Sequence, residues 1–405
     1  MRILLFEPDH RGHHFYYLKM LAAELNQLVP DVTLAISQSA PLTQEYAIHC
    51  RSLESGFAID ATFPEITGTP TRIAFGRIRM LRDMIRRHRP DHVYVPYGDG
   101  LTQMLGCLQF FRQFPFLKDM ETETQLMRGG FAYPSDDPWT SVKREVSLLS
   151  LQFSPWTRIH HLDPIPYEAI QRRGGPLAAR TRLICELMDR RPPLAKRDAR
   201  RRLGIPEDGA YLGCVGLIDT RKGIDLLLRA FQDVARDLAD WRLLLVGQVK
   251  SPIDDLLNRD HQGLVRAGRI VVVNRYVSDD EIESAISALD LMCTPYPRHI
   301  GSSGVVVRAA AAGRPILGSE YGWIGQTISR FELGTTCDVT NPGAFSRSLR
   351  DAVKTASQYA ISPKGRRFLK YHSKENHFAS WTERLRQRLG LPPAEGGCDW
   401  ETIIG

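Results

Sequence analysis

Residues 290–317 read DLMCTPYPRHIGSSGVVVRAAAAGRPIL. The pattern predicts a strand, a loop of small residues, a helix, and a second strand after a Gly-Arg-Pro break. In the loop Gly301–Gly304, glycine and serine let the backbone turn tightly and present N–H groups at a helix start. Such an arrangement binds anions, most often phosphate. The alternative is an ordinary strand-to-helix turn capped by Ser302 or Ser303, and this loop alone leaves both interpretations open.

The composition describes a globular protein of two or three domains. The chain has 405 residues, of which 43% are hydrophobic and 24% charged. It contains no run of the ~20 apolar residues that a membrane span needs. The apolar run after Met1 is too short for a signal peptide, and the seven cysteines are dispersed without metal-ligand spacing. We therefore expect a cytoplasmic protein with reduced thiols.

The net charge of +7 is concentrated in a few segments. Residues 77–89 form a predicted amphipathic helix with six arginines. Its basic face is either simply solvated or a contact with an anionic membrane surface, and both interpretations stay open. Nucleic acid is not expected as a partner, because no recognised binding motif or aromatic platform accompanies the arginines.

Short β-rich runs alternate with helical stretches, which predicts parallel sheets with helices on both faces. In the first half the predicted strands are Arg2–Phe6, Val32–Ser37, His92–Val95 and Arg158–Leu162. In the second half they are Ala210–Val215, Arg242–Val246, Arg269–Val273, Leu289–Cys293, Pro315–Leu317 and Thr335–Val339. Residues 114–156 give no clear pattern. Six strands in the second block fit a doubly wound sheet of order 3-2-1-4-5-6.

In that order the first and fourth strands of the second block are neighbours, and ligands bind beyond their carboxyl ends. The loop after the first strand runs from Gly216 to Gly223 and carries Arg221 and Lys222. The loop after the fourth contains Gly301–Gly304. Two cations and a helix start would face each other there, which suits a diphosphate. The alternative for the two cations is a solvated turn.

In the first block the loop after the first strand is PDHRGHH, residues 8–14. Gly12 permits close backbone approach, and His13 or His14 is a candidate for touching a sugar or transferring a proton. Solvated histidines in a helix's first turn are an equally supported interpretation. Asp99 is a further carboxylate at this sheet edge, or else a helix cap. The histidine pair lacks the carboxylate partners and spacing of a metal site.

Several motifs of the second half resemble the GT-B glycosyltransferases, notably the retaining family 4. They are the KGIDLLLRAF run at 222–231, LLLVG at 243–247, VSDDE at 277–281 and AAAAGRP at 309–315. The resemblance covers residues 199–352 well and the first half in outline.

The resemblance implies an α/β fold of two Rossmann-like doubly wound domains facing a central cleft. The expected domains are an acceptor-side domain at 1–188 and a nucleotide-sugar-binding domain at 189–373. The helix at 374–390 is expected to pack back on the first domain, with a tail at 391–405. The nucleotide-diphosphate sugar would be a substrate, with no separate cofactor.

The sequence departs from the family pattern at its two glutamates, which would fall near Ile300 and Arg308. By resemblance Lys222 keeps the diphosphate role, and Arg221 substitutes for an arginine replaced by Leu217. His13 and His299 are the catalytic candidates. The expected nucleotide-sugar ligands are Gly12, Gly216, Arg221, Lys222, Arg275, Ser302, Ser303, Gly304, Val305 and Arg308.

The predicted function is metal-independent glycosyl transfer from a nucleotide-diphosphate sugar to a hydroxyl of a glycan, a lipid-linked or a small acceptor. The resemblance implies retention of configuration. An inverting mechanism would instead need a base such as His13 or Asp99. The alternatives are a non-catalytic nucleotide- or glycan-binding protein, suggested by the missing glutamates, and a GT-B epimerase or phosphorylase. The expected location is cytoplasmic, or peripheral at the inner face of the membrane.

Overall fold

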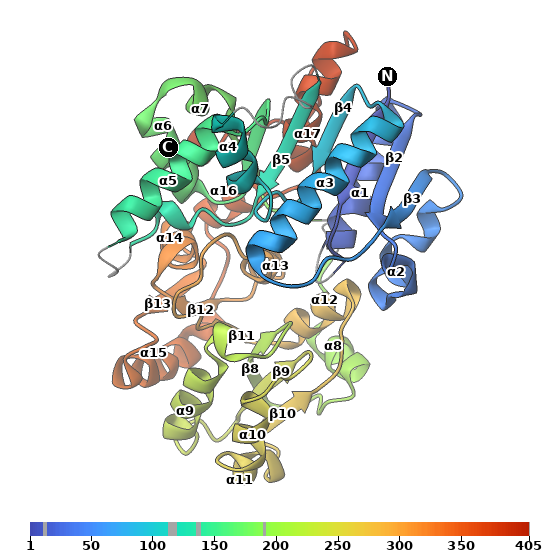
Figure 1. Cartoon of the computed structure of the whole chain (residues 1–405). Coiled ribbons are helices and arrows are strands. Elements are labelled where there is room, and N and C mark those ends of the chain that lie inside the picture. Colours follow the sequence, from blue (N-terminus) through green and yellow to red (C-terminus); the bar gives the residue numbers. More distant parts are fainter. Residues whose placement is uncertain (11–13, 112–119, 135–138, 189–191, 405) are drawn as a thin grey trace. The chain divides into compact units, whose positions relative to one another are not determined.

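The structure, a computed structural model, describes residues 1–10, 14–111, 120–134, 139–188 and 192–404. Its contacts divide the chain into two compact units, each built around its own parallel sheet (Figure 1). The first unit comprises Met1–Cys185 and Glu375–Gly397. The second comprises Glu186–Lys374 and Cys398–Gly405.

The sheet of the first unit has seven parallel strands in the order β3-β2-β1-β4-β5-β6-β7. The strands are β1 (Ile3–Glu7), β2 (Val32–Ser37), β3 (Ala58–Phe63), β4 (His92–Val95), β5 (Glu121–Leu126), β6 (Arg158–His161) and β7 (Thr181–Leu183). The helices are α1 (His14–Leu28), α2 (Gln44–His49), α3 (Pro70–His88), α4 (Thr102–Phe110), α5 (Thr140–Phe153), α6 (Pro164–Arg173), α7 (Gly175–Arg180) and α17 (Lys374–Arg388). Every residue of β1 and β2 is buried, as in parallel sheets covered by helices on both faces.

The four strands predicted in this half are confirmed to within one residue at each end, but β3, β5 and β7 were not predicted. Strand β5 has the polar sequence ETETQL, which lacks the apolar pattern of a buried strand. Its fully buried Glu123 lies 3.0 Å from His92 Nε2 and 2.8 Å from His160 Nε2. Burial alone would raise the pKa of Glu123, but the two histidines outweigh it and lower that pKa to about 2. Tertiary pairing thus makes a polar strand acceptable in the core.

Helix α17 belongs to the first unit although it lies near the end of the chain; Figure 1 shows it, in red, among the blue and green elements. The buried Trp381 stacks on His160 with ring centroids 4.6 Å apart and donates its indole N–H to Gln125 at 3.3 Å. Arg384 Nε donates to Glu121 at 2.8 Å. These contacts fix α17 on β5 and β6.

The sheet of the second unit has the strand order β10-β9-β8-β11-β12-β13, which confirms the predicted 3-2-1-4-5-6 pattern. The strands are β8 (Ala210–Val215), β9 (Trp241–Val246), β10 (Ile270–Val273), β11 (Leu291–Thr294), β12 (Ile316–Ser319) and β13 (Gly334–Cys337). The helices are α8 (Lys196–Leu203), α9 (Ile224–Val234), α10 (Ile253–Asn258), α11 (Gln262–Arg266), α12 (Asp279–Ala288), α13 (Gly304–Ala311), α14 (Gly322–Arg330), α15 (Pro342–Thr355), α16 (Pro363–Tyr371) and α18 (Trp400–Ile404). Helix α18 packs Trp400 against Phe331 and Tyr371, with ring centroids 5.8 and 5.4 Å apart.

Candidate functional site

Two loops of the second unit meet at the carboxyl ends of β8 and β11, which are paired in parallel. The first, from Gly216 to Gly223, includes the 3-10 turn η5 (Thr220–Lys222). Gly223 has a φ of +66°, and a Cβ there would lie 2.1 Å from the Pro295 carbonyl oxygen. Only glycine allows this turn and this close approach. The turn after β8 is therefore packed directly on the segment that follows β11.

Lys222 is the central cation of this edge, with 6% of its surface exposed. Its Nζ donates to the Val215 carbonyl at 2.6 Å and lies 5.7 Å from the centroid of the Tyr296 ring. Burial lowers the pKa of Lys222. Within the described residues no carboxylate lies at ion-pair distance from its ammonium group. A buried cation without a counter-ion favours an anionic ligand, because desolvation of the charge is otherwise uncompensated.

The start of α13 supplies hydrogen-bond donors to the same edge. Ser303 is the N-cap residue, but its side chain makes no capping hydrogen bond, and the first turn contains no acid. The N–H groups of Gly304 and Val305 have no acceptor in the part of the chain that is described. Free N–H groups and the helix dipole both attract an anion.

A line of contacts joins this helix start to Lys222. The ring of His299 lies 5.5 Å from that of Tyr296, and its Nε2 donates to the Ser302 carbonyl at 3.1 Å. Tyr296 in turn lies beside Lys222. His299 thus holds the backbone of the loop, a positioning contact that its place in the sequence did not reveal.

The predicted arginine ligands have carboxylate partners within the second unit. Arg308 lies 2.8 Å from Asp279 and 3.3 Å from Glu283. Arg275 pairs with Glu281. Arg221 is half exposed and lies 3.6 Å from Asp219. Of the predicted cations, Lys222 alone is buried without a carboxylate partner among the described residues.

The candidate residues of the first unit are described only in part, because Gly12 and His13 lie outside the described residues. The next residue, His14, donates from Nδ1 to Glu7 at 2.9 Å and stacks on Tyr97 at 3.7 Å. Burial would lower the pKa of His14, but the charge and hydrogen bond of Glu7 raise it overall. The Asp99 carboxylate accepts from two backbone N–H groups after β5, so it fixes a loop, and burial raises its pKa.

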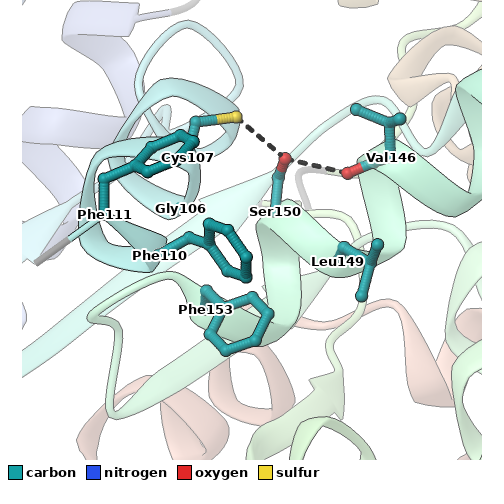
Figure 2. Close-up of a pocket in the computed structure, with 8 residues that line it drawn as sticks. All are labelled: Gly106, Cys107, Phe110, Phe111, Val146, Leu149, Ser150 and Phe153. Carbon is teal, nitrogen blue, oxygen red and sulfur yellow. Dashed lines mark hydrogen bonds between the residues drawn. The ribbon is translucent and has the colours of Figure 1, made fainter.

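Helices α4 and α5 enclose an apolar groove of about 150 Å³ (Figure 2). Of the two, α5 lies in residues 114–156, where the sequence shows no clear pattern. The helices approach so closely that a Cβ on Gly106 would lie 1.8 Å from the Ser150 carbonyl oxygen. The lining residues are Gly106, Cys107, Phe110, Phe111, Val146, Leu149, Ser150 and Phe153. Because none of these side chains is charged, the groove is not suited to bind a diphosphate.

The described residues contain no group of three or more His, Cys, Asp and Glu side chains that could hold a metal ion. Within the same residues no helix is long and apolar enough to cross a membrane.

Comparison with known proteins places these features in a family context. Residues 209–355 match the family described as glycosyl transferases group 1. The solved structure of HepE from Anabaena with UDP and glucose is 15% identical, with a TM-score of 0.67, and the alignment covers 96% of this chain and 99% of HepE. Sucrose-phosphate synthase from Thermosynechococcus elongatus gives 18% identity, a TM-score of 0.68 and the same coverages. The fold is GT-B. The match to the group 1 glycosyltransferases also confirms, on residues 209–355, the resemblance to glycosyltransferases that the motifs of the second half indicated.

Two curated relatives match part of this GT-B chain. The D-inositol 3-phosphate glycosyltransferase of Nocardioides sp. is 29% identical over 175 residues, which cover 40% of this chain and 38% of the relative. The lipopolysaccharide core biosynthesis mannosyltransferase LpsB of Rhizobium meliloti is 25% identical over 141 residues, 34% of this chain and 39% of LpsB. The matches thus span well under half the length of either relative.

Proposed function

We propose that this GT-B protein transfers a hexosyl group from a nucleoside-diphosphate sugar to a hydroxyl acceptor. The observation that carries the proposal is the line of contacts from Lys222 through Tyr296 and His299 to Ser302, just before α13. Along one sheet edge of the second unit lie a buried cation and two N–H groups that have no carboxylate partner and no acceptor, respectively, among the described residues. Together they fit one diphosphate.

The chemistry follows from where charge develops. Breaking the bond between the sugar C1 and the diphosphate oxygen leaves negative charge on the departing diphosphate. The Lys222 ammonium and the N–H groups of Gly304 and Val305 are fixed before the reaction and stabilise that charge. These fixed donors and this cation do the work that Mg²⁺ does in other phosphate sites, so the proposed transfer is metal-independent. UDP-glucose is the first donor to test, because HepE has been solved with UDP and glucose.

The remaining site residues keep narrower proposed roles. Ser302 and Ser303 shape the anion loop, Gly216 gives the phosphate access to Lys222, and Arg221 supports it from the surface. Arg275 and Arg308 are proposed to act near the nucleoside. We assign proton transfer or sugar contact to His13, and His299 acts by holding the Ser302 backbone. Retention of configuration is the proposed stereochemistry.

The Lys222→Ala variant tests the proposal. Removing one fixed cation from a charge-stabilising site lowers the rate by ~10²–10³. We expect this loss in nucleotide release from UDP-, GDP- or dTDP-sugars, with weaker binding of the same nucleotides by calorimetry. Lys354→Ala, an exposed lysine on α15, is the matched control and should behave as wild type. Wild-type turnover by Lys222→Ala would refute the proposed role.

A second candidate is a nucleotide-binding protein without transferase activity. It is favoured by Arg308, which occupies a position where the resemblance expects a glutamate and pairs with Asp279 and Glu283. Nucleotide binding without transfer of sugar to any acceptor in a mixture would support this second candidate. Recovery of an isomerised donor would instead identify an epimerase.

The acceptor is proposed to be a glycan or a lipid-linked sugar at the inner face of a membrane. Helix α3 supports a peripheral contact: Arg79 and Arg86 are exposed and form no ion pair within the described residues. Arg77, Arg82 and Arg87 instead pair with carboxylates.

A further inference from the structure

A carboxylate from a distant part of the chain lies at the anion loop. Glu186 follows β7 by three positions and is separated from Ser302 by 116 positions. Its Oε2 accepts a hydrogen bond from Ser302 Oγ at 2.6 Å. No motif in the sequence marks Glu186, and the proposed function does not use it.

The second carboxylate oxygen faces the start of α13. Glu186 Oε1 lies 3.4 Å from the position that a Cβ on Gly304 would take. A single methyl group on Gly304 would therefore touch the carboxylate. Gly304 and Val305 are the residues whose N–H groups have no acceptor in the described chain. The negative charge of Glu186 thus lies where the helix dipole and these donors favour an anion.

We propose that Glu186 is a built-in competitor that holds the anion position at α13 until the donor diphosphate displaces it. This inference rests on the proposed function. A carboxylate and a diphosphate at the same helix start repel each other strongly, since water screens them poorly in a half-buried loop. The diphosphate binds when its additional contact with Lys222 outweighs the loss of the contact between Glu186 and Ser302. Glu186 thereby lowers the affinity of the site for the donor.

The backbone of Glu186 connects this competition to a second segment. Its N–H donates to His372 Nδ1 at 3.0 Å. Glu186 is the first residue of the second unit, and His372 lies two positions before Lys374, where the chain leaves that unit. The hydrogen bond between Glu186 and His372 joins these two boundary segments, so displacement of the Glu186 carboxylate should affect this bond. Donor binding should loosen this hydrogen bond and speed exchange of the Glu186 amide hydrogen.

The test compares Glu186→Gln with wild type in titrations with UDP, with UDP-glucose and with inorganic pyrophosphate. The amide keeps the shape and can still accept from Ser302, but it carries no charge. Because the variant lacks the charge that repels a diphosphate, we expect UDP and pyrophosphate to bind Glu186→Gln about tenfold more tightly. A tenfold change corresponds to about 1.4 kcal/mol. Glu207→Gln removes one charge at the opposite edge of the same sheet, before β8, and should bind both ligands as wild type does. Equal melting temperatures of the variants show that each is folded.

Three outcomes would overturn the inference. Unchanged or weaker binding of UDP and pyrophosphate by Glu186→Gln would show that the carboxylate does not compete. Weaker binding of UDP-glucose alone would make Glu186 a contact of the sugar. If neither wild type nor Glu186→Gln bound any nucleoside diphosphate or pyrophosphate, the proposed function would fall together with this inference. Hydrogen exchange at residues 184–188 with and without UDP adds a readout that a purely structural contact would leave unchanged.

Discussion

Several titratable residues of this protein lie in the interior, where the surrounding fold determines their charge. Lys222 stays in the interior, where a carbonyl is the one acceptor of its ammonium group within the described residues, and Glu123 stays ionised between two histidines. His161 on β6 is fully buried, and neither ring nitrogen has a hydrogen-bond partner among the described residues. We therefore expect Lys222 to affect the binding of a diphosphate, and His161 to affect how the free energy of unfolding depends on pH.

His161 makes the stability of the protein fall in mild acid. Burial lowers its pKa to about 3, whereas an unfolded histidine has a pKa of ~6.5. Below pH 6.5 the unfolded state therefore binds a proton that the native state does not, so the free energy of unfolding decreases as the pH falls. His377, with a pKa lowered by burial to about 4, acts in the same direction.

We predict that His161→Leu reduces the pH slope of the unfolding free energy by about 1.2 kcal/mol per pH unit between pH 6 and pH 5. Urea unfolding at these pH values and at pH 8 measures it. At pH 8 the histidine is neutral in both the folded and the unfolded state. The difference in unfolding free energy between wild type and His161→Leu at pH 8 therefore reports packing alone. An unchanged slope would mean that His161 is accessible to protons in the native state.

At the scale of elements, the packing of the turn η5 on the segment after β11 depends on glycine at position 223. Gly223 and Gly268 have φ angles of +66° and +65°, but only a Cβ at Gly223 would meet another atom within 4 Å. We predict that Gly268→Ala costs ~1–2 kcal/mol of backbone strain and leaves UDP binding unchanged. Gly223→Ala should cost more and weaken UDP binding at least tenfold, because it pushes Lys222 away from Pro295. Urea unfolding and calorimetry on both variants measure the contrast. Equal behaviour would show that the contact of the two loops does not matter for binding.

The elements also show which parts of the fold can be predicted from sequence patterns. Apolar runs such as Leu243–Val246 were predicted because both faces of a parallel strand are buried. Strand β5 was missed because it is polar, and the partners of its buried Glu123, His92 and His160, lie far away in the sequence. The convergence of two loops followed from strand order, which obeys a general rule. Glu186 followed from none of these, since its partner Ser302 is 116 positions away.

At the scale of the whole molecule, the net charge of +7 bears on the proposed peripheral membrane contact. We predict that the double variant Arg79→Glu/Arg86→Glu loses at least tenfold in binding to vesicles that contain anionic lipid, since each basic residue near such a surface contributes ~1 kcal/mol. Co-sedimentation with anionic and with neutral vesicles measures the loss. Arg236→Glu/Arg347→Glu makes the same charge change on the second unit and should bind as wild type. Equal loss in both double variants would indicate an effect of net charge alone.

The central claim is that the Lys222 turn and the start of α13 bind the same diphosphate. A crystal structure of the protein with UDP tests it most directly. The account predicts the β-phosphate within ~3 Å of Lys222 Nζ and of the N–H groups of Gly304 and Val305, with the Glu186 carboxylate displaced from Ser302. A diphosphate bound elsewhere, or one held without Lys222 or without the N–H groups of α13, would contradict it.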